Sequence, residues 1–130
     1  MAKATAELAD LIAAAAAEYG FDASKVWAAG FSNGANTAVA LLHQHPAVLN
    51  GAVAFSVTKA LAEPIDPVSD LAGKKIFIAN GQIDPHAPIA VARQLAEQLK
   101  GLGATVQFVE HAEGHTILMP HLRQAIAFIN

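Results

Sequence analysis

The chain of 130 residues has the length of one domain and is long enough to bury a single hydrophobic core. Its 54% of hydrophobic and 15% of charged residues exclude an intrinsically disordered segment. Eight Lys and Arg residues against eleven Asp and Glu residues give a net charge of −3 without a basic cluster, so neither nucleic acid nor an anionic membrane is expected as a partner. Because the chain has no cysteine, disulfides, thiolate metal sites and cysteine nucleophiles are excluded.

The most apolar stretch lies near the N-terminus, where Glu7, Asp10 and Glu18 interrupt or flank it. It falls short of the roughly 18 uninterrupted apolar residues that a membrane span needs. The sequence shows no targeting segment either. We therefore expect a soluble, cytoplasmic protein.

Hydrophobic periodicity predicts helices that alternate with short apolar strands. The first element is a helix at 3–19, followed by an apolar strand at 26–31 of the kind that is buried on both faces. A helix at 35–45, a strand at 51–55 and a long loop at 56–73 come next. The chain ends with a strand at 75–79, a helix at 89–102, a strand at 105–110 and a helix at 120–128. The first helix is expected to bury one apolar face, made of Leu8, Leu11, Ile12, Ala15, Ala16 and Tyr19.

Strands separated by helices of this length indicate right-handed crossovers and a parallel sheet. The predicted class is α/β, with about four parallel strands and helices on both faces, and residues 1–130 form one domain. The strand at 105–110 alternates polar and apolar residues, as an edge strand does. The strand at 26–31 has no charge, proline or bulge signal, although only one helix precedes it. Since a bare apolar edge is a template for pairing, either a second copy pairs with it or the chain is a piece of something larger.

The segment Gly30-Phe31-Ser32-Asn33-Gly34 lies between a predicted strand and a predicted helix. This context is typical of a nucleophile elbow, in which a serine occupies a strained turn and points its hydroxyl out of the sheet. Side chains two residues to either side would collide there, which accounts for Gly30 and Gly34. The backbone amide of Asn33 is placed to donate to an oxyanion. The alternative is an ordinary strand-to-helix turn.

A serine nucleophile needs a base and a carboxylate that orients it. Asp84 follows the strand at 75–79, and His115 follows the strand at 105–110. Parallel strands bring such residues to the same end of the sheet, and the order Ser32, Asp84, His115 is the order expected when an elbow serine leads. We predict Ser32 as nucleophile, His115 as base and then acid, and Asp84 as the orienting group. Singly, Asp84 also fits a turn or helix cap, and His115 also fits a surface loop.

The other polar residues and motifs give weaker evidence for a function. His111 and His115, with Glu113 between them, do not form a metal site, because Gly114 makes a helical His face unfavourable; we expect no metal and no cofactor. His43 and His45 are expected in solvent near a helix end. A nucleotide-binding α/β domain is disfavoured, since Gly101-Leu102-Gly103 lacks a third glycine and follows a helix.

The motifs together resemble α/β-hydrolase carboxylesterases, in particular the phospholipase/carboxylesterase and dienelactone-hydrolase-like groups. The resemblance runs from Tyr19-Gly20 to Ala35-Asn36 and includes Gly81-Gln82-Ile83-Asp84-Pro85 and Glu113-Gly114-His115. It implies that Ser32, Asp84 and His115 match the family's triad.

Members of this family carry four further strands before the helix that opens this chain, together with the loop that supplies the second oxyanion donor. The resemblance therefore implies the C-terminal half of the fold and weak esterase activity on small esters. We also expect two copies to pair their Val26–Phe31 edges antiparallel into an eight-stranded sheet and form a homodimer. The alternative function is a catalytically inactive, self-associating structural half-domain, natural or engineered.

Overall fold

The computed structural model describes residues 2–22 and 25–130. Four strands form one parallel sheet in the order β1-β2-β3-β4, with each strand beside its neighbour in sequence. The strands are β1 (Trp27–Phe31), β2 (Gly51–Phe55), β3 (Lys75–Gly81) and β4 (Thr105–His111). All four carboxyl ends therefore lie at one end of the sheet, as the sequence predicted.

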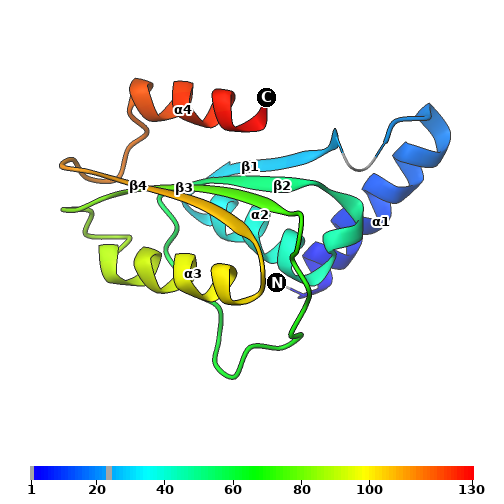
Figure 1. Cartoon of the computed structure of the whole chain (residues 1–130), viewed down its shortest axis with the longest axis horizontal. Coiled ribbons are helices and arrows are strands. Elements are labelled where there is room, and N and C mark those ends of the chain that lie inside the picture. The colour runs from blue at the N-terminus through cyan, green and yellow to red at the C-terminus, as the bar shows by residue number, and fades with distance from the viewer. Residues whose placement is uncertain (1, 23–24) are drawn as a thin grey trace.

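Helices cover both faces of this sheet (Figure 1). α2 (Asn33–Gln44) and α3 (Ile89–Gly101) lie on one face, and α4 (Met119–Ile129) lies on the other. α1 (Ala2–Tyr19) is the outermost helix on the side of α2, and the short helix η2 (Pro46–Val48) connects α2 to β2. The α/β class and the four-stranded parallel sheet are thus confirmed.

The core lies around β2 and β3, the two central strands. Every residue of β2 is buried, and so are six of the seven residues of β3. On the α2 and α3 side, Leu42, Ile76 and Leu95 are at most 1% exposed. On the α4 side, Phe77 packs near Phe128, with ring centroids 5.9 Å apart. The apolar runs Gly51–Phe55 and Ile76–Ala79 in these strands fit burial on both faces.

β1 differs from the prediction of a strand buried on both faces. Ala29 and Phe31 are exposed, and the other residues of β1 are only partly buried. The reason is the position of β1 at the edge of the sheet, where β2 is its one partner among the described residues. β4 forms the opposite edge and shows alternating burial over Thr105–Phe108, as its sequence predicts, whereas its last three residues are all at least partly buried.

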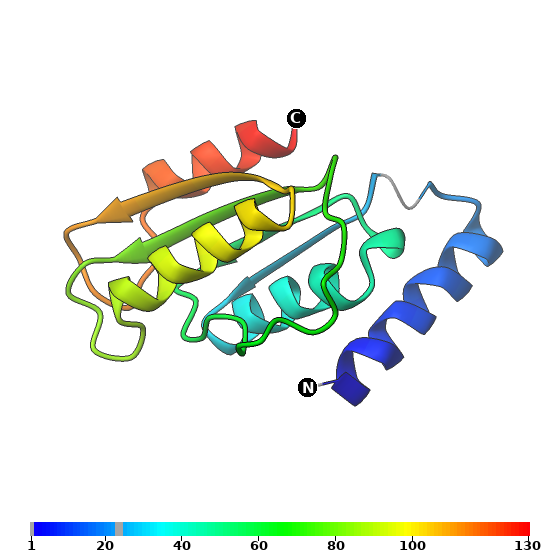
Figure 2. The ribbon, with the colours of Figure 1, turned by 60° about the horizontal axis from the view of Figure 1, so that its bottom comes forward.

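The apolar face predicted for α1 is only partly covered. Leu11 is 65% exposed and Tyr19 is 76% exposed, whereas Thr5 and Ala9 are buried. Figure 2 shows why: α1 stands at the end of the molecule, beyond α2. α1 packs on α2 and η2, so its apolar residues have little surface to cover them.

The segment between β2 and β3 has no regular structure, and two side-chain amides fix its start at Val57 and Thr58. Asn80 of β3 is fully buried and bonds both the backbone N–H and the backbone C=O of Val57. Asn36 of α2 accepts from the N–H of Thr58 and donates to its hydroxyl oxygen. These bonds replace the ladder that a strand would provide. In the part of the chain described, no helix is long and apolar enough to cross a membrane.

Candidate active site

Ser32 stands in the turn between β1 and α2, with φ 58° and ψ −116°. A positive φ is strained for a residue with a side chain and persists only where the surroundings fix it. Here the Ser32 N–H donates to the C=O of Phe55 at 2.9 Å, and its C=O accepts from the N–H of Asn36 at 3.1 Å. The sheet on one side and the helix on the other thus hold the turn that the motif predicts.

The two glycines of the motif differ in their surroundings. A Cβ added to Gly30 would lie 2.3 Å from the carbonyl carbon and oxygen of Gly34, so only glycine fits at position 30. A Cβ added to Gly34 would meet no non-neighbouring atom within 4 Å among the described residues. The expected collision at position 34 is therefore wrong for this chain, because the space beside the first turn of α2 is open along the edge of β1.

The three residues predicted to act together lie within hydrogen-bond distance of one another. His115 Nδ1 lies 2.5 Å from Asp84 Oδ2, and His115 Nε2 lies 3.0 Å from Ser32 Oγ. An ionised carboxylate only accepts, so Nδ1 carries the proton and Nε2 is left as the acceptor for the serine hydroxyl. The Ser32 hydroxyl therefore donates to His115 Nε2, and His115 Nδ1–H donates to Asp84 Oδ2.

Asp84 has the environment of an orienting carboxylate. Its side chain is fully buried, and Oδ1 accepts from the backbone N–H groups of His86 and Ala87 at 2.8 and 3.1 Å. Burial alone raises the pKa of Asp84, but the hydrogen bonds from His115 and from the two amides outweigh it and hold the pKa below its ordinary value. The carboxylate therefore stays ionised opposite the His115 ring.

Two rings flank His115. The Phe31 ring centroid lies 4.8 Å from that of His115, and the His86 centroid lies 5.3 Å from it. His115 keeps 22% of its side chain exposed, whereas Asp84 keeps none. The His115 ring is thus held from the sides and open towards solvent.

Asn33 is the first residue of α2. Its backbone N–H belongs to the first turn, whose amides have no partner inside the helix. The positive end of the helix dipole adds to these donors. The amide can therefore face an oxyanion formed beside Ser32.

Gly81 was part of a motif in the sequence analysis, but no structural role was predicted for it. A Cβ at this last position of β3 would lie 2.2 Å from the carbonyl oxygen of Glu113 and 2.4 Å from that of Gly114. The segment that leads to His115 therefore rests directly on the backbone of Gly81. A glycine at the end of a strand is a known signal of such close approach.

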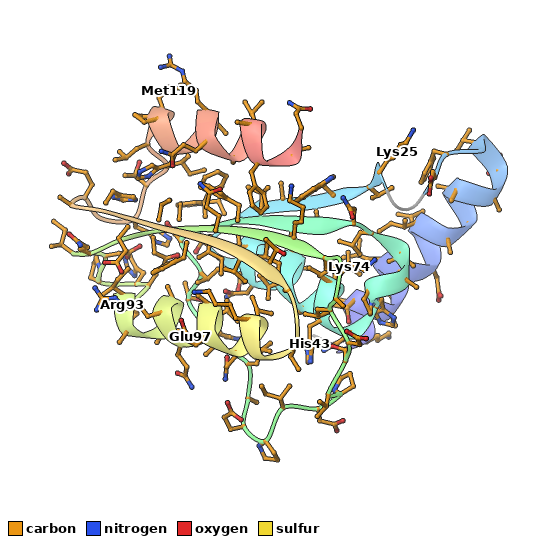
Figure 3. The ribbon with its side chains drawn as sticks, viewed as in Figure 1. Lys25, His43, Lys74, Arg93, Glu97 and Met119 are labelled. Carbon is orange, nitrogen blue, oxygen red and sulfur yellow. The ribbon has the colours of Figure 1, made fainter. Side chains whose placement is uncertain are left out.

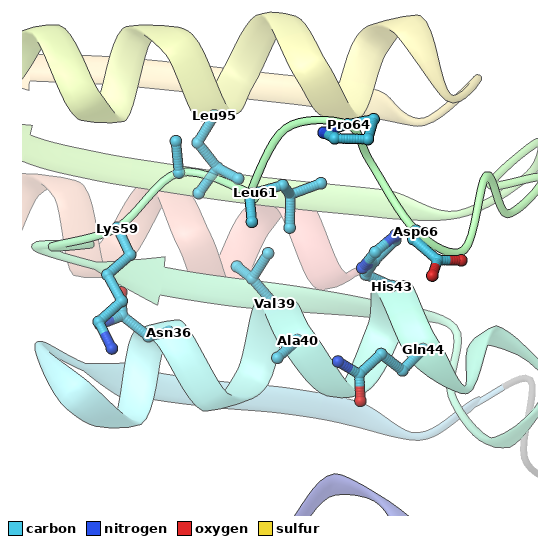
Figure 4. Close-up of a pocket in the computed structure, with 12 residues that line it drawn as sticks. Asn36, Val39, Ala40, His43, Gln44, Lys59, Leu61, Pro64, Asp66 and Leu95 are labelled. Carbon is cyan, nitrogen blue, oxygen red and sulfur yellow. The ribbon is translucent and has the colours of Figure 1, made fainter. Parts of the chain in front are cut away.

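Two hollows lie away from these three residues. One has a volume of about 310 Å³ and lies between α2, α3 and the segment after β2 (Figure 4). Lys59 lies at one end of it, and His43 and Asp66 lie at the other. His43, which was expected in solvent, is 4% exposed, and its Nε2 lies 2.7 Å from the carbonyl oxygen of Pro67.

The second hollow, of about 490 Å³, follows the open edge of β1 between α1 and α2. Its lining includes Leu8 and Ile12 of α1, Trp27 of β1 and Gly34 of α2. Among the described residues, no group of three or more His, Asp or Glu side chains is arranged to hold a metal ion.

The architecture is α/β-hydrolase-like, and solved structures match it over nearly the whole chain. The carboxylesterase from Bacillus cereus superposes with a TM-score of 0.88 and 34% identity, covering 96% of this chain and 58% of that one. The carboxylesterase from Mesorhizobium loti gives a TM-score of 0.80 at 29% identity, covering 95% and 59%. The chain thus spans a little over half the length of these relatives.

The sequence comparisons agree. The phospholipase/carboxylesterase family matches residues 1–130, and the chain belongs to this family. The putative hydrolase MhqD of Bacillus subtilis (strain 168) is 33% identical over 126 residues, which cover 93% of this chain and 60% of that protein. The resemblance inferred from the motifs is confirmed, including its restriction to part of a longer chain.

Proposed function

We propose that this chain is a serine hydrolase that cleaves small carboxylic esters through Ser32, His115 and Asp84. The observation that carries the proposal is the continuous set of contacts from Ser32 Oγ through the imidazole of His115 to the buried carboxylate of Asp84. Membership of the phospholipase/carboxylesterase family supports the same reaction class. No cofactor takes part in this mechanism.

In the proposed reaction, His115 Nε2 takes the proton of Ser32 as Oγ attacks the ester carbonyl carbon. The N–H of Asn33 donates to the resulting oxyanion. His115 then gives its proton to the leaving alcohol, which leaves Ser32 acylated. A water molecule attacks the acyl-enzyme with the same base, and the carboxylic acid and free Ser32 are released.

We propose that the 130-residue chain is a slow enzyme. Asn33 supplies one oxyanion donor, and the family resemblance puts the second donor in a segment that would precede α1. Loss of one such donor lowers turnover by about 10²–10³-fold.

The test is hydrolysis of p-nitrophenyl acetate and butyrate by the purified chain and by Ser32→Ala. We expect the variant to fall to the level of the buffer, while Ser69→Ala, in the segment between β2 and β3, keeps the rate of the unmodified chain. Reaction with a fluorophosphonate probe adds a direct readout, because only an activated serine is labelled. Equal rates of ester hydrolysis for the unmodified chain and Ser32→Ala would show that the chain has no esterase activity through Ser32.

We further propose that two copies pair their Val26–Phe31 edges antiparallel. The bond from Asn50 to Val26 O and the bond from Ser32 to Phe55 O direct the backbone of residues 26, 28, 30 and 32 towards β2. Since successive residues of a strand point their polar groups to opposite sides, those of Trp27, Ala29 and Phe31 face outwards. This outward row is what a second copy would bond.

This dimer also supports the alternative function, a self-associating structural half-domain without catalysis. Antiparallel pairing would put the two Ser32 residues at opposite ends of the shared sheet, so neither copy would complete the other's oxyanion hole. Sedimentation at micromolar concentration tests the dimer, with Ala29→Pro as the variant. Proline at position 29 removes an outward N–H and leaves the bonds to β2 intact, so we expect a folded monomer. A stable monomer of the unmodified chain would contradict the dimer.

A further inference from the structure

Two buried imidazole nitrogens that have no hydrogen-bond partner among the described residues belong to rings that face each other beside the candidate site. His111 ends β4 and is 7% exposed; His121 lies in the first turn of α4 and is partly buried. Their ring centroids are 5.4 Å apart, and the ring planes meet at 34°. The unpartnered atoms are His111 Nε2 and His121 Nδ1.

A hydrogen bond on the other side of the His111 ring fixes its tautomer. The backbone N–H of Glu113 donates to His111 Nδ1 at 3.2 Å, so Nδ1 carries no proton and the neutral ring has its proton on Nε2. Nε2 is therefore a donor, and the facing His121 Nδ1 is an acceptor in the neutral tautomer that carries its proton on Nε2. A buried polar atom left without a partner destabilises the folded state. A small ring movement or one bridging water molecule would let these two atoms satisfy each other.

The same bond argues against a metal ion between the rings. Coordination through Nε2 would require the proton to move to Nδ1, where it would oppose the N–H of Glu113. The pKa of His121 is lowered by burial and by the nearby His111, which favours the neutral acceptor. Among the described residues, no third metal-ligating side chain joins the two histidines.

The pair lies against the segment that delivers the proposed base. Residues 112–114 lead into His115, and the N–H of Glu113 is the group that His111 holds. The carbonyl groups of Glu113 and Gly114 lie against Gly81, and so does the His111 ring, whose Cε1 is 2.8 Å from the position of a Cβ on Gly81. The segment thus packs on the strand partners Gly81 and His111, and His121 faces this arrangement from α4.

Apart from His121, α4 has few buried residues that could hold it beside the segment before His115. Ala125 is its one buried side chain among the described residues, while Met119 and Ile126 are more than 50% exposed. Its C-terminal part is tied to the sheet by Lys75, whose ammonium group donates to the carbonyl of Phe128 at 2.9 Å. In the first turn of α4, Met119–Leu122, His121 is the one residue that is not exposed.

We propose that His111 and His121 are positioning residues: a neutral donor–acceptor pair that holds residues 112–114 so that His115 reaches both Ser32 and Asp84. This inference rests on the proposed catalytic role of His115.

Matched substitutions distinguish the effect of losing a hydrogen bond from the effect of losing packing. In His111→Asn, the side-chain oxygen takes the place of Nδ1 and accepts from Glu113, whereas His111→Leu fills the space without an acceptor. His121→Asn and His121→Leu make the same comparison for the acceptor that faces His111. We expect each Leu variant to slow fluorophosphonate labelling of Ser32 about tenfold and to lower kcat more than it raises KM. His121→Asn should stay within about threefold of the unmodified chain. His111→Asn keeps the bond from Glu113 but loses the Nε2 donor, so its rate should lie between those of His111→Leu and the unmodified chain.

Two measurements decide the proposal even if the chain proves to lack esterase activity. Nitrogen-15 NMR of the histidine rings should show His111 protonated on Nε2 and His121 unprotonated on Nδ1. The proton between His115 and Asp84 should give a low-field resonance that persists in His111→Asn and is lost in His111→Leu. A His111 ring protonated on Nδ1, or a low-field resonance that survives in both His111 variants, would overturn the pair.

Discussion

Gly30 near the end of β1 meets the backbone of Gly34 in the first turn of α2 so closely that no side chain fits between them. An added Cβ on Gly30 would lie 2.3 Å from two backbone atoms of Gly34 and 2.7 Å from the N atom of Ala35. Because Gly30 and Gly34 approach each other so closely, the chain turns from β1 into α2 at a single residue, Ser32. The glycine at 30 is therefore part of what forces the serine into its strained turn.

Gly30→Ala and Gly34→Ala should have opposite effects. At position 30 the Cβ can only be accommodated by moving backbone, so we expect a loss of more than about 3 kcal/mol of stability, at the upper end of single substitutions. At position 34 the Cβ has space, and alanine in a helix is favoured over glycine by up to about 1 kcal/mol. Urea denaturation of both variants is the measurement. Equal losses would show that position 34 is more confined than the structure indicates.

Gly81→Ala should displace the segment before His115 while the sheet remains folded. The added Cβ would lie 2.2 Å from the carbonyl oxygen of Glu113, and the exposed loop can yield more easily than β3. We expect at least a tenfold loss of Ser32 labelling with little change in circular dichroism. Gly114→Ala is the control, since a Cβ there meets no non-neighbouring described atom within 4 Å. A Gly81→Ala variant that labels as fast as the control would contradict this account.

Asp84→Asn should preserve the fold and abolish most activity. Asparagine keeps an oxygen for the two backbone N–H groups that Oδ1 now accepts. It would present an NH₂ group to His115, which favours the tautomer with its proton on Nε2 and leaves no acceptor for Ser32. Such a change lowers kcat by about 10⁴-fold in a serine triad. The rate of p-nitrophenyl acetate hydrolysis measures it, with the thermal midpoint as the check on folding.

Glu110→Gln should destabilise the protein at neutral pH but not in strong acid. Arg93, labelled in Figure 3, donates two hydrogen bonds to Glu110, and these bonds together with one from Gln82 lower the pKa of Glu110 from 4.5 to about 2. A lowered pKa in the folded state contributes stability that is complete above pH 4.5 and is lost as the pH falls through 2.

The thermal midpoints of the chain and Glu110→Gln should therefore differ at pH 7 and converge near pH 2. Glu97→Gln is the control, because Glu97 is 75% exposed and its pair with Lys100 at 3.3 Å is a surface contact on α3. A difference that stays constant down to pH 2 would contradict the assignment of the shift to the Arg93 pair.

Local features of the sequence were enough to predict the elements and their order. Apolar runs bounded by turn residues predicted all four strands, and β3 and β4 extend only two and one residues further than expected. The triad residues could be proposed because parallel strands bring their carboxyl ends together, so Ser32, Asp84 and His115 needed only the right position after a strand.

Burial and close approach required the tertiary structure. Leu11 and Tyr19 have the periodicity of a buried helix face, but periodicity does not say whether another surface exists to cover it, and at the end of this molecule little does. Gly81 and His111 look like ordinary strand-end residues in the sequence. Their importance comes from the fold, which brings residues about thirty positions apart into backbone contact. The sequence by itself thus determined the strands and the candidate residues that follow them, whereas the packing of β3 against β4 decided where His115 stands.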